Sequence, residues 1–154
     1  MAAQSTMLTE KTQERTAIDK RFHWNVESLY SSWEAWEEDL KQWGREEKEP
    51  HWPELAAFRE SWKQSPENLK ALIELCCEID RHLSKLYTYA HVRHDEDVSE
   101  ETAKKAHSRI VSMLYAFRQE TAWIEPEMLQ LPEETLDRLI ASPVLKEYAF
   151  HLEK

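Results

Sequence analysis

Two histidines and three acidic side chains lie close together near the middle of the chain. His91 and His94 are three residues apart, and Asp95, Glu96 and Asp97 follow them directly. Imidazole nitrogens and carboxylate oxygens are common metal ligands, and residues three apart can share one face of a helix. This spacing raises the hypothesis of a small metal-binding protein that uses His91, His94 and the adjacent acids.

The same stretch departs from the established metal motifs. A structural zinc site takes four protein ligands, and a catalytic site takes three plus water. The segment HVRH lacks the spacing and the glutamate of the His-Glu-x-x-His motif, and DEDVSEE lacks the central glycine of a calcium loop. We therefore interpret residues 91–97 as a helix end and turn. The basic residues favour the negative helix C-terminus, and the acids favour the N-terminus of the next helix.

The composition predicts a single helical domain. The chain has 154 residues, of which 41% are hydrophobic, and it contains one glycine, Gly44. Tight turns between strands need glycine, so helices with polar or proline-marked connections are favoured. We predict a mobile N-terminal arm over residues 1–20 and one helical domain over residues 21–154. The seven tryptophans are expected to pack inside it rather than to form a binding surface.

The hydrophobic periodicity locates the first helices. Ser31 and Glu34 have capping-box spacing, and we predict a helix from there that stops at Gly44. A second helix is expected to begin near Pro53. A third, capped by Ser65 and opened by a proline at position 66, is expected to run for nearly thirty residues, to about residue 93.

The remaining helices follow from caps and prolines. Asp97 or Ser99 can cap a fourth helix that runs to about residue 123. Pro126 is expected to interrupt the chain, and Pro132 and Pro143 to open two shorter helices. The predicted fold is all-α, a bundle of about five to six helices with two long antiparallel central helices.

Charge and composition argue against several classes of partner. The formal net charge of -10 makes nucleic acid an unfavourable partner. No apolar run is long enough to cross a membrane and the N-terminus lacks the apolar core of a signal peptide, so we expect no membrane partner and a cytoplasmic location. Cys76 and Cys77 are adjacent, so no disulfide is expected. The residue chemistry by itself indicates a soluble helical domain with no visible active site.

Four segments, taken in order along the chain, resemble one enzyme family. They are FHWNVESLYSSWEAWEEDL (22–40), LSKLYTYAHVRHDEDVSEE (83–101), WIEPEMLQLPEETLDRLI (123–140) and SPVLKEYAFHLEK (142–154). They are similar to segments of oligoendopeptidase F, a bacterial zinc metallopeptidase of the thimet-oligopeptidase type. The positions that match its pattern, all of them structural, are Trp24, Leu29, Tyr30, Trp36, Tyr87, Tyr89, Asp97, Pro126 and Tyr148.

The resemblance implies that the chain is the N-terminal helical part of a larger, nearly all-helical peptidase. In that family a deep cleft admits only short, unstructured peptides, and this region forms part of the cleft wall. The zinc site lies further along, in a His-Glu-x-x-His helix that has no counterpart in this sequence. The resemblance therefore assigns no catalytic and no metal-binding residue to this chain, and zinc is expected in the parent enzyme. The implied partners are the missing catalytic domain of the same protein and an oligopeptide substrate.

The C-terminal segment supports two further expectations. Its helical period continues to Lys154 without a glycine, proline or cap, which suggests a longer parent protein. We expect an exposed apolar surface there, and hence self-association of the chain alone, from the side chains of Leu145, Tyr148, Phe150 and Leu152. The alternative function is a stand-alone helical protein-interaction module. That alternative predicts a closed core and a final helix whose deletion barely changes the melting temperature.

Overall fold

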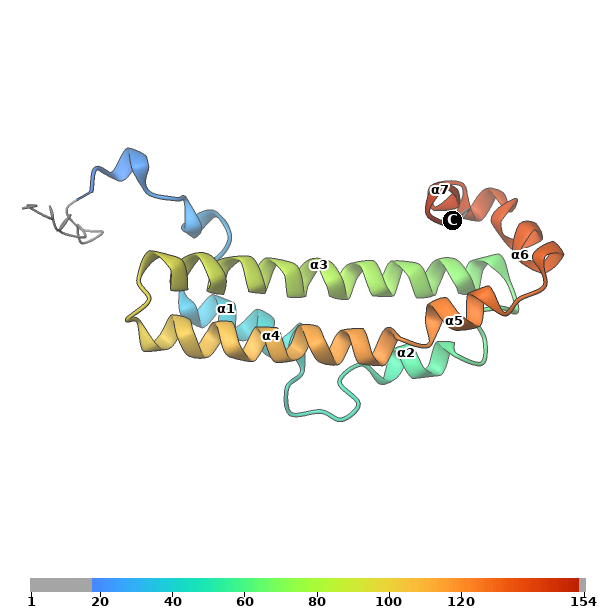
Figure 1. Cartoon of the computed structure of the whole chain (residues 1–154), viewed down its shortest axis with the longest axis horizontal. Helices are drawn as coiled ribbons and strands as arrows, with labels where there is room; N and C mark the ends of the chain where they lie inside the picture. The colour runs from blue at the N-terminus through green and yellow to red at the C-terminus, as the bar shows by residue number, and fades with distance from the viewer. Residues whose placement is uncertain (1–17, 153–154) are drawn as a thin grey trace, which may run out of the picture.

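The computed structural model describes residues 18–152 as an elongated bundle of helices (Figure 1). The α-helices are α1 (Trp33–Asp39), α2 (Pro53–Phe58), α3 (Pro66–Glu96), α4 (Glu101–Thr121), α5 (Ile124–Leu129), α6 (Glu133–Ile140) and α7 (Ala149–Leu152). Shorter turns are the 3-10 helices η2 (Lys20–Phe22), η3 (Val26–Ser28) and η5 (Pro143–Leu145), and the π-helical turn η4 (Leu40–Gly44). No strand occurs among these residues, so the predicted all-α fold is confirmed. The predicted arm over residues 1–20 lies almost entirely outside the described residues.

The long helices α3 and α4 form a hairpin along the long axis of the molecule (Figure 1). The 31 residues of α3 correspond to about 46 Å at 1.5 Å per residue, and α4 returns antiparallel beside it after a short turn. The predicted start of α3 is confirmed: the hydroxyl of Ser65 accepts a 3.2 Å hydrogen bond from the backbone N–H of Asn68, and Pro66 opens the first turn. In the described part of the chain, no helix combines the length and apolarity needed to cross a bilayer.

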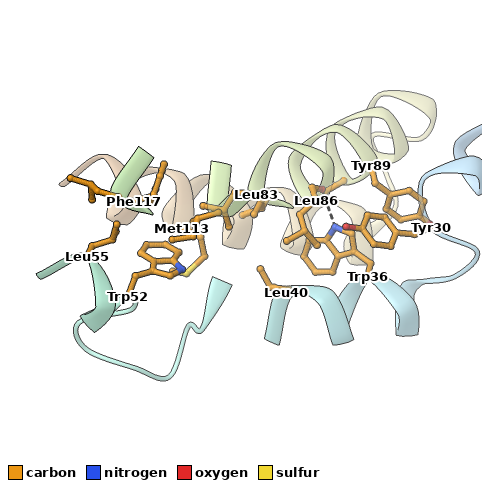
Figure 2. Packing of buried hydrophobic residues seen from close by; sticks show 14 of the residues in the cluster. Tyr30, Trp36, Leu40, Trp52, Leu55, Leu83, Leu86, Tyr89, Met113 and Phe117 are labelled. Atoms are coloured by element: carbon orange, nitrogen blue, oxygen red, sulfur yellow. Dashed lines mark hydrogen bonds between the residues drawn. The ribbon is translucent and has the colours of Figure 1, made fainter. Parts of the chain in front are cut away.

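Buried tryptophans fix the shorter helices to this hairpin. Trp36, Trp52 and Trp62 are each at most 1% exposed, which confirms a packing role for these three side chains. Figure 2 shows Trp36 beside Leu86, and its indole N–H donates a 2.9 Å hydrogen bond to the Leu86 carbonyl oxygen. The indole of Trp52 donates in the same way to the carbonyl of Trp43, at 2.8 Å. Because a buried donor without a partner costs about 1–3 kcal/mol, these bonds let the indoles be buried completely.

Polar contacts hold the loop between η4 and α2. The carboxylate of Glu120 on α4 accepts hydrogen bonds from the backbone N–H of His51, at 2.8 Å, and of Trp52, at 2.9 Å. One of its oxygens also lies 2.8 Å from Nδ1 of His51. Nearer the start of α4, Arg109 pairs with Glu37 on α1. The hairpin is therefore attached to α1 and α2 by charge-assisted contacts as well as by apolar packing.

Two helix starts differ from the sequence prediction. The cap of α1 is Ser32 rather than Ser31, and its hydroxyl accepts a 3.3 Å hydrogen bond from the N–H of Ala35. The helix α4 starts after Glu100, which makes no side-chain cap, so neither of the two predicted caps is used. The first difference arises where two adjacent serines offer the same capping chemistry. In the second, the carboxylate of Asp97 accepts its hydrogen bonds from Ser99 within the turn.

Pro126 does not interrupt the helix as predicted. It is the third residue of α5, which starts at Ile124. Proline is tolerated there because the first N–H groups of a helix have no intrahelical acceptor to lose. Pro132 is the N-cap of α6 and Pro143 opens η5, so these two prolines do mark the starts of short helical segments, as predicted.

Replacing Gly44 by alanine is expected to destabilise the fold. A Cβ atom at Gly44 would lie 2.6 Å from Cδ1 of the fully buried Leu40 and 3.4 Å from Cγ of Met113. Overpacking of this kind costs about 1–3 kcal/mol, so Gly44→Ala should lower the free energy of unfolding measured in urea by that amount. The matched control is Lys41→Ala, at an exposed position of the same turn. A Gly44→Ala variant as stable as the control would contradict this account of the packing.

Candidate functional site

The structure brings three histidines together in one cluster. His91 and His94, near the end of α3, both contact His107 of α4, with ring centroids 5.3 Å and 5.6 Å apart. Tyr87 packs against His91 at 5.2 Å and against His107 at 5.5 Å. The sequence prediction missed His107 because only the register of the hairpin brings this residue to the other two.

The cluster is not built as a metal centre. Nε2 of His91 lies 3.4 Å from a carboxylate oxygen of Asp95, and Nδ1 of His94 lies 3.7 Å from the same carboxylate group. Across residues 18–152, no group of three or more histidine, cysteine, aspartate or glutamate side chains is arranged to hold a metal ion. The donor set here therefore does not fit the zinc of a metallopeptidase, and the metal hypothesis for residues 91–97 gains no support.

Asp97 organises the turn between α3 and α4. Its carboxylate accepts a 2.9 Å hydrogen bond from the backbone N–H of Ser99 and a second bond from the Ser99 hydroxyl. These bonds from Ser99 lower the pKa of Asp97 below its ordinary value. Glu100, the next acid, lies 3.6 Å from Arg93 and accepts a 3.3 Å bond from the indole of Trp33. Asp97 thus stabilises the turn, in line with the interpretation from the sequence. Asp95 and Glu96 differ from that interpretation, because they are the last two residues of α3, where they pair with His91, His94 and Arg93 of the same helix.

The positions that match the family pattern fall into three classes of burial. Tyr30, Trp36 and Tyr89 are buried; Leu29, Tyr87 and Tyr148 are half-buried; Trp24, Asp97 and Pro126 are exposed. The rings of Tyr30 and Tyr89 meet edge to face at 5.4 Å, and the Tyr30 hydroxyl donates to Asp39. Burial and this carboxylate raise the pKa of Tyr30. The buried members join the N-terminal segment to α3, while the roles of the exposed members remain predictions.

An apolar groove lies at the other end of the hairpin. Its volume is about 440 Å³, and it is lined by side chains of α3, of α4 and α5, and of the final helix α7. The apolar and thiol side chains at its surface are those of Leu72, Ile73, Cys76, Cys77, Phe117, Ile124, Met128 and Leu152. Its two ionisable carboxylates belong to Asp80 and Glu125. No catalytic pair of acid and base can be assigned within this lining, but its shape and apolarity suit the packing of another polypeptide.

The expected apolar surface of the C-terminal segment is partly correct. Phe150 is 68% exposed, and Leu152 lines the groove. Leu145 was expected to be exposed but is fully buried, because η5 packs against α3. Tyr148 is half-buried. The exposed apolar surface therefore consists of the groove and Phe150 rather than of the whole final segment.

The sequence is similar to those of bacterial oligopeptidases. No family model matches the chain. It is 23% identical over 141 residues to the group B oligopeptidase PepB of Streptococcus agalactiae, an alignment that covers 91% of this chain and 23% of PepB. It is 24% identical over 154 residues to the oligopeptidase PepF of Bacillus subtilis, covering 97% of this chain and 22% of PepF. The plasmid-encoded oligoendopeptidase F of Lactococcus lactis subsp. cremoris is 24% identical, with 91% and 23% covered.

The structural comparison agrees with these sequence relatives. A protein from Chlamydophila abortus, whose crystal structure is described as that of a peptidase, superposes with a TM-score of 0.84 and is 31% identical. The superposition covers 93% of this chain and 24% of that protein. The chain thus spans less than a quarter of the length of each of these relatives. The resemblance to oligoendopeptidase F is therefore confirmed, and the chain corresponds to one region of peptidases of this type.

Proposed function

We propose that the chain is the N-terminal helical portion of an oligoendopeptidase F-like zinc metallopeptidase that hydrolyses short peptides. In this proposal the region forms part of the substrate-cleft wall and packs against a catalytic domain that carries the zinc site. Zinc and the activation of the attacking water belong to that domain. The oligopeptide is the substrate of the whole enzyme.

The observation that carries the proposal is the extent of the similarity. More than nine tenths of the chain aligns with peptidases, yet it accounts for 22–23% of the length of the sequence relatives. Within residues 18–152, no group of three or more histidine, cysteine, aspartate or glutamate side chains is arranged to hold a metal ion. This supports the proposal that the zinc site belongs to another domain of the enzyme. A region of this kind contributes shape and packing rather than the reacting groups.

The apolar groove is the surface we assign to packing against the remainder of the peptidase. It is open, mostly apolar and continuous with α7, where Phe150 is 68% exposed. Apolar patches of this kind are uncommon on monomeric proteins and usually mark interaction surfaces. In the isolated chain this surface would meet water or a second copy.

The experiment that tests the proposal is the intact mass of the native protein in its source cells, together with the reading frame after Lys154. A mass far above 18.4 kDa with a downstream His-Glu-x-x-His segment would support it. A mass near 18.4 kDa would contradict it, because the cell would then make the chain without a zinc site.

A second candidate function is a stand-alone helical interaction module. The complete burial of Leu145 favours it, because the turn η5 then packs on α3 within the chain itself and needs no further domain to cover this side chain. Removal of residues 149–154 separates the two functions. If the chain is a stand-alone module, its melting temperature should not change after this deletion. If it is a region that packs against the rest of a peptidase, it should aggregate more readily, because Leu152 no longer lines the groove.

The isolated chain is expected to self-associate through the groove and α7. Phe150→Glu places a charge on this apolar surface and should shift the average mass in sedimentation equilibrium toward the monomer. Val98→Glu is the matched control, because Val98 is 71% exposed but lies in the α3–α4 turn at the other end of the hairpin. A monomeric wild-type chain over a wide concentration range, or equal effects of the two variants, would count against the assignment.

The two cysteines of the groove are expected to react at different rates. Burial raises the pKa of the Cys76 thiol to about 11, and this side chain is half-buried, whereas Cys77 is exposed. At about pH 8 only about 0.1% of Cys76 is thiolate, so iodoacetamide should modify Cys77 first in a mass-spectrometric time course. If the groove mediates self-association, Cys77 should also react more slowly at high protein concentration. Equal rates for the two thiols would show that the groove is not packed as described.

A further inference from the structure

The three-histidine cluster joins the two helices of the hairpin close to its turn. His91 and His94 come from the last two turns of α3, and His107 lies in the second turn of α4. His107 is the shared member, because its ring contacts both of the others, at 5.3 Å and 5.6 Å. The contacts are stacked or tilted ring packing, which neutral imidazoles make without repulsion. The end of the hairpin is thus closed by titratable groups.

A proton on His107 would meet unfavourable surroundings. The titratable groups that face it from α3 are Tyr87, His91, His94 and Asp95, and Asp95 alone can carry a compensating negative charge. That carboxylate is already within 3.4 Å of His91 and 3.7 Å of His94. A positive charge on His107 would therefore compete with the other two imidazoles for a single carboxylate, across ring separations of 5.3 Å and 5.6 Å.

Hydrogen bonding leads to the same conclusion. Nε2 of His107 is shielded from solvent and has no hydrogen-bond partner among the described residues. A neutral imidazole can leave one nitrogen as an unused acceptor, but a protonated ring carries N–H groups on both nitrogens. Protonation would thus place a donor where no acceptor is present, which destabilises the closed arrangement.

We propose that the three histidines act as a proton-operated latch on the α3–α4 hairpin. While His107 is neutral the cluster holds the two helices together beside their turn, and protonation of His107 loosens this end. Burial, together with the neighbouring His91 and His94, holds the pKa of His107 below the ordinary value of 6.5. Because the open state binds the proton more readily, the stabilisation is complete above about pH 6.5 and is lost as the pH falls below it.

Opening would have a local consequence. Asp95 also lines a small hollow with Ile18, Phe22 and Trp24 of the N-terminal segment. Phe22 is 70% exposed and Trp24 is 58% exposed. Asp95 is therefore shared between the surroundings of the histidine cluster and this exposed aromatic surface. Loosening the last turns of α3 would change how this surface is presented, while the tryptophan-rich middle of the hairpin stays packed.

The test is amide hydrogen exchange of the whole chain between about pH 7.5 and about pH 5.5, corrected for the intrinsic rate, with NMR titration of the histidine rings. Wild-type residues 92–104 should lose protection several-fold more than residues 69–83 as the pH falls, and the ring of His107 should titrate below its ordinary value of 6.5. His107→Gln keeps a polar side chain without a titrating ring and should remove the local loss. His82→Gln, elsewhere on α3, should retain it.

Three results would overturn the proposal. Unchanged wild-type protection at residues 92–104 over this pH range would exclude the latch. Equal loss in wild type and His107→Gln would assign the acid response to other groups. Equal loss at both ends of α3 would show that acid unfolds the hairpin globally. If His107→Gln does not fold, His94→Gln provides the second variant, and it should raise the pKa of His107 and weaken the acid response.

Discussion

The apolar contact between α3 and α4 is the interaction on which the rest of the structure depends. A helix of 31 residues with a charged outer face gains most of its stability from packing one apolar face against a partner. Leu83 and Leu86 of α3 and Met113 of α4 belong to one buried cluster, which Trp36 and Trp52 extend from the shorter helices (Figure 2). Truncating a buried tryptophan costs about 3–5 kcal/mol, whereas an exposed ion pair contributes about 0–1 kcal/mol. Packing along the hairpin, and not the many surface charge pairs, therefore determines the fold.

Local chemistry explains which helix boundaries could be predicted. Ser65 and Pro66 act on the first turn of α3 whatever surrounds it, so this start is visible in the sequence. The choice between Ser31 and Ser32 is different, because two adjacent hydroxyls can cap equally well. Starting the helix after Ser32 accompanies the complete burial of Trp36, so a tertiary contact settles a local ambiguity. The end of α3 was predicted at about residue 93 from its apolar period, whereas the helix continues to Glu96 and so includes two acids that the charge argument assigned to the next helix.

Sites that combine several elements could not be predicted in the same way. The spacing of His91 and His94 is visible in one segment, but His107 joins them only through the register of the hairpin. Leu145 looked like part of an exposed face, yet the chain turns back after α5 and places its last elements beside the first half of α3 (Figure 1). Apolar periodicity shows that a side chain has a packing face, but the path of the chain decides whether that face finds a partner.

Several carboxylates of residues 18–152 are used to hold loops and helices of the fold in place. Glu120 accepts hydrogen bonds from two backbone N–H groups and contacts His51, and Arg109 is shared between Glu37 and Glu46. Those two carboxylates raise the pKa of Arg109. Groups held in this way cannot accept a proton or bind a reacting atom without releasing the loop or helix that they hold in place. Carboxylates held in this way shape the fold of the region. In a peptidase of the proposed type, the groups that activate water would come from the rest of the enzyme.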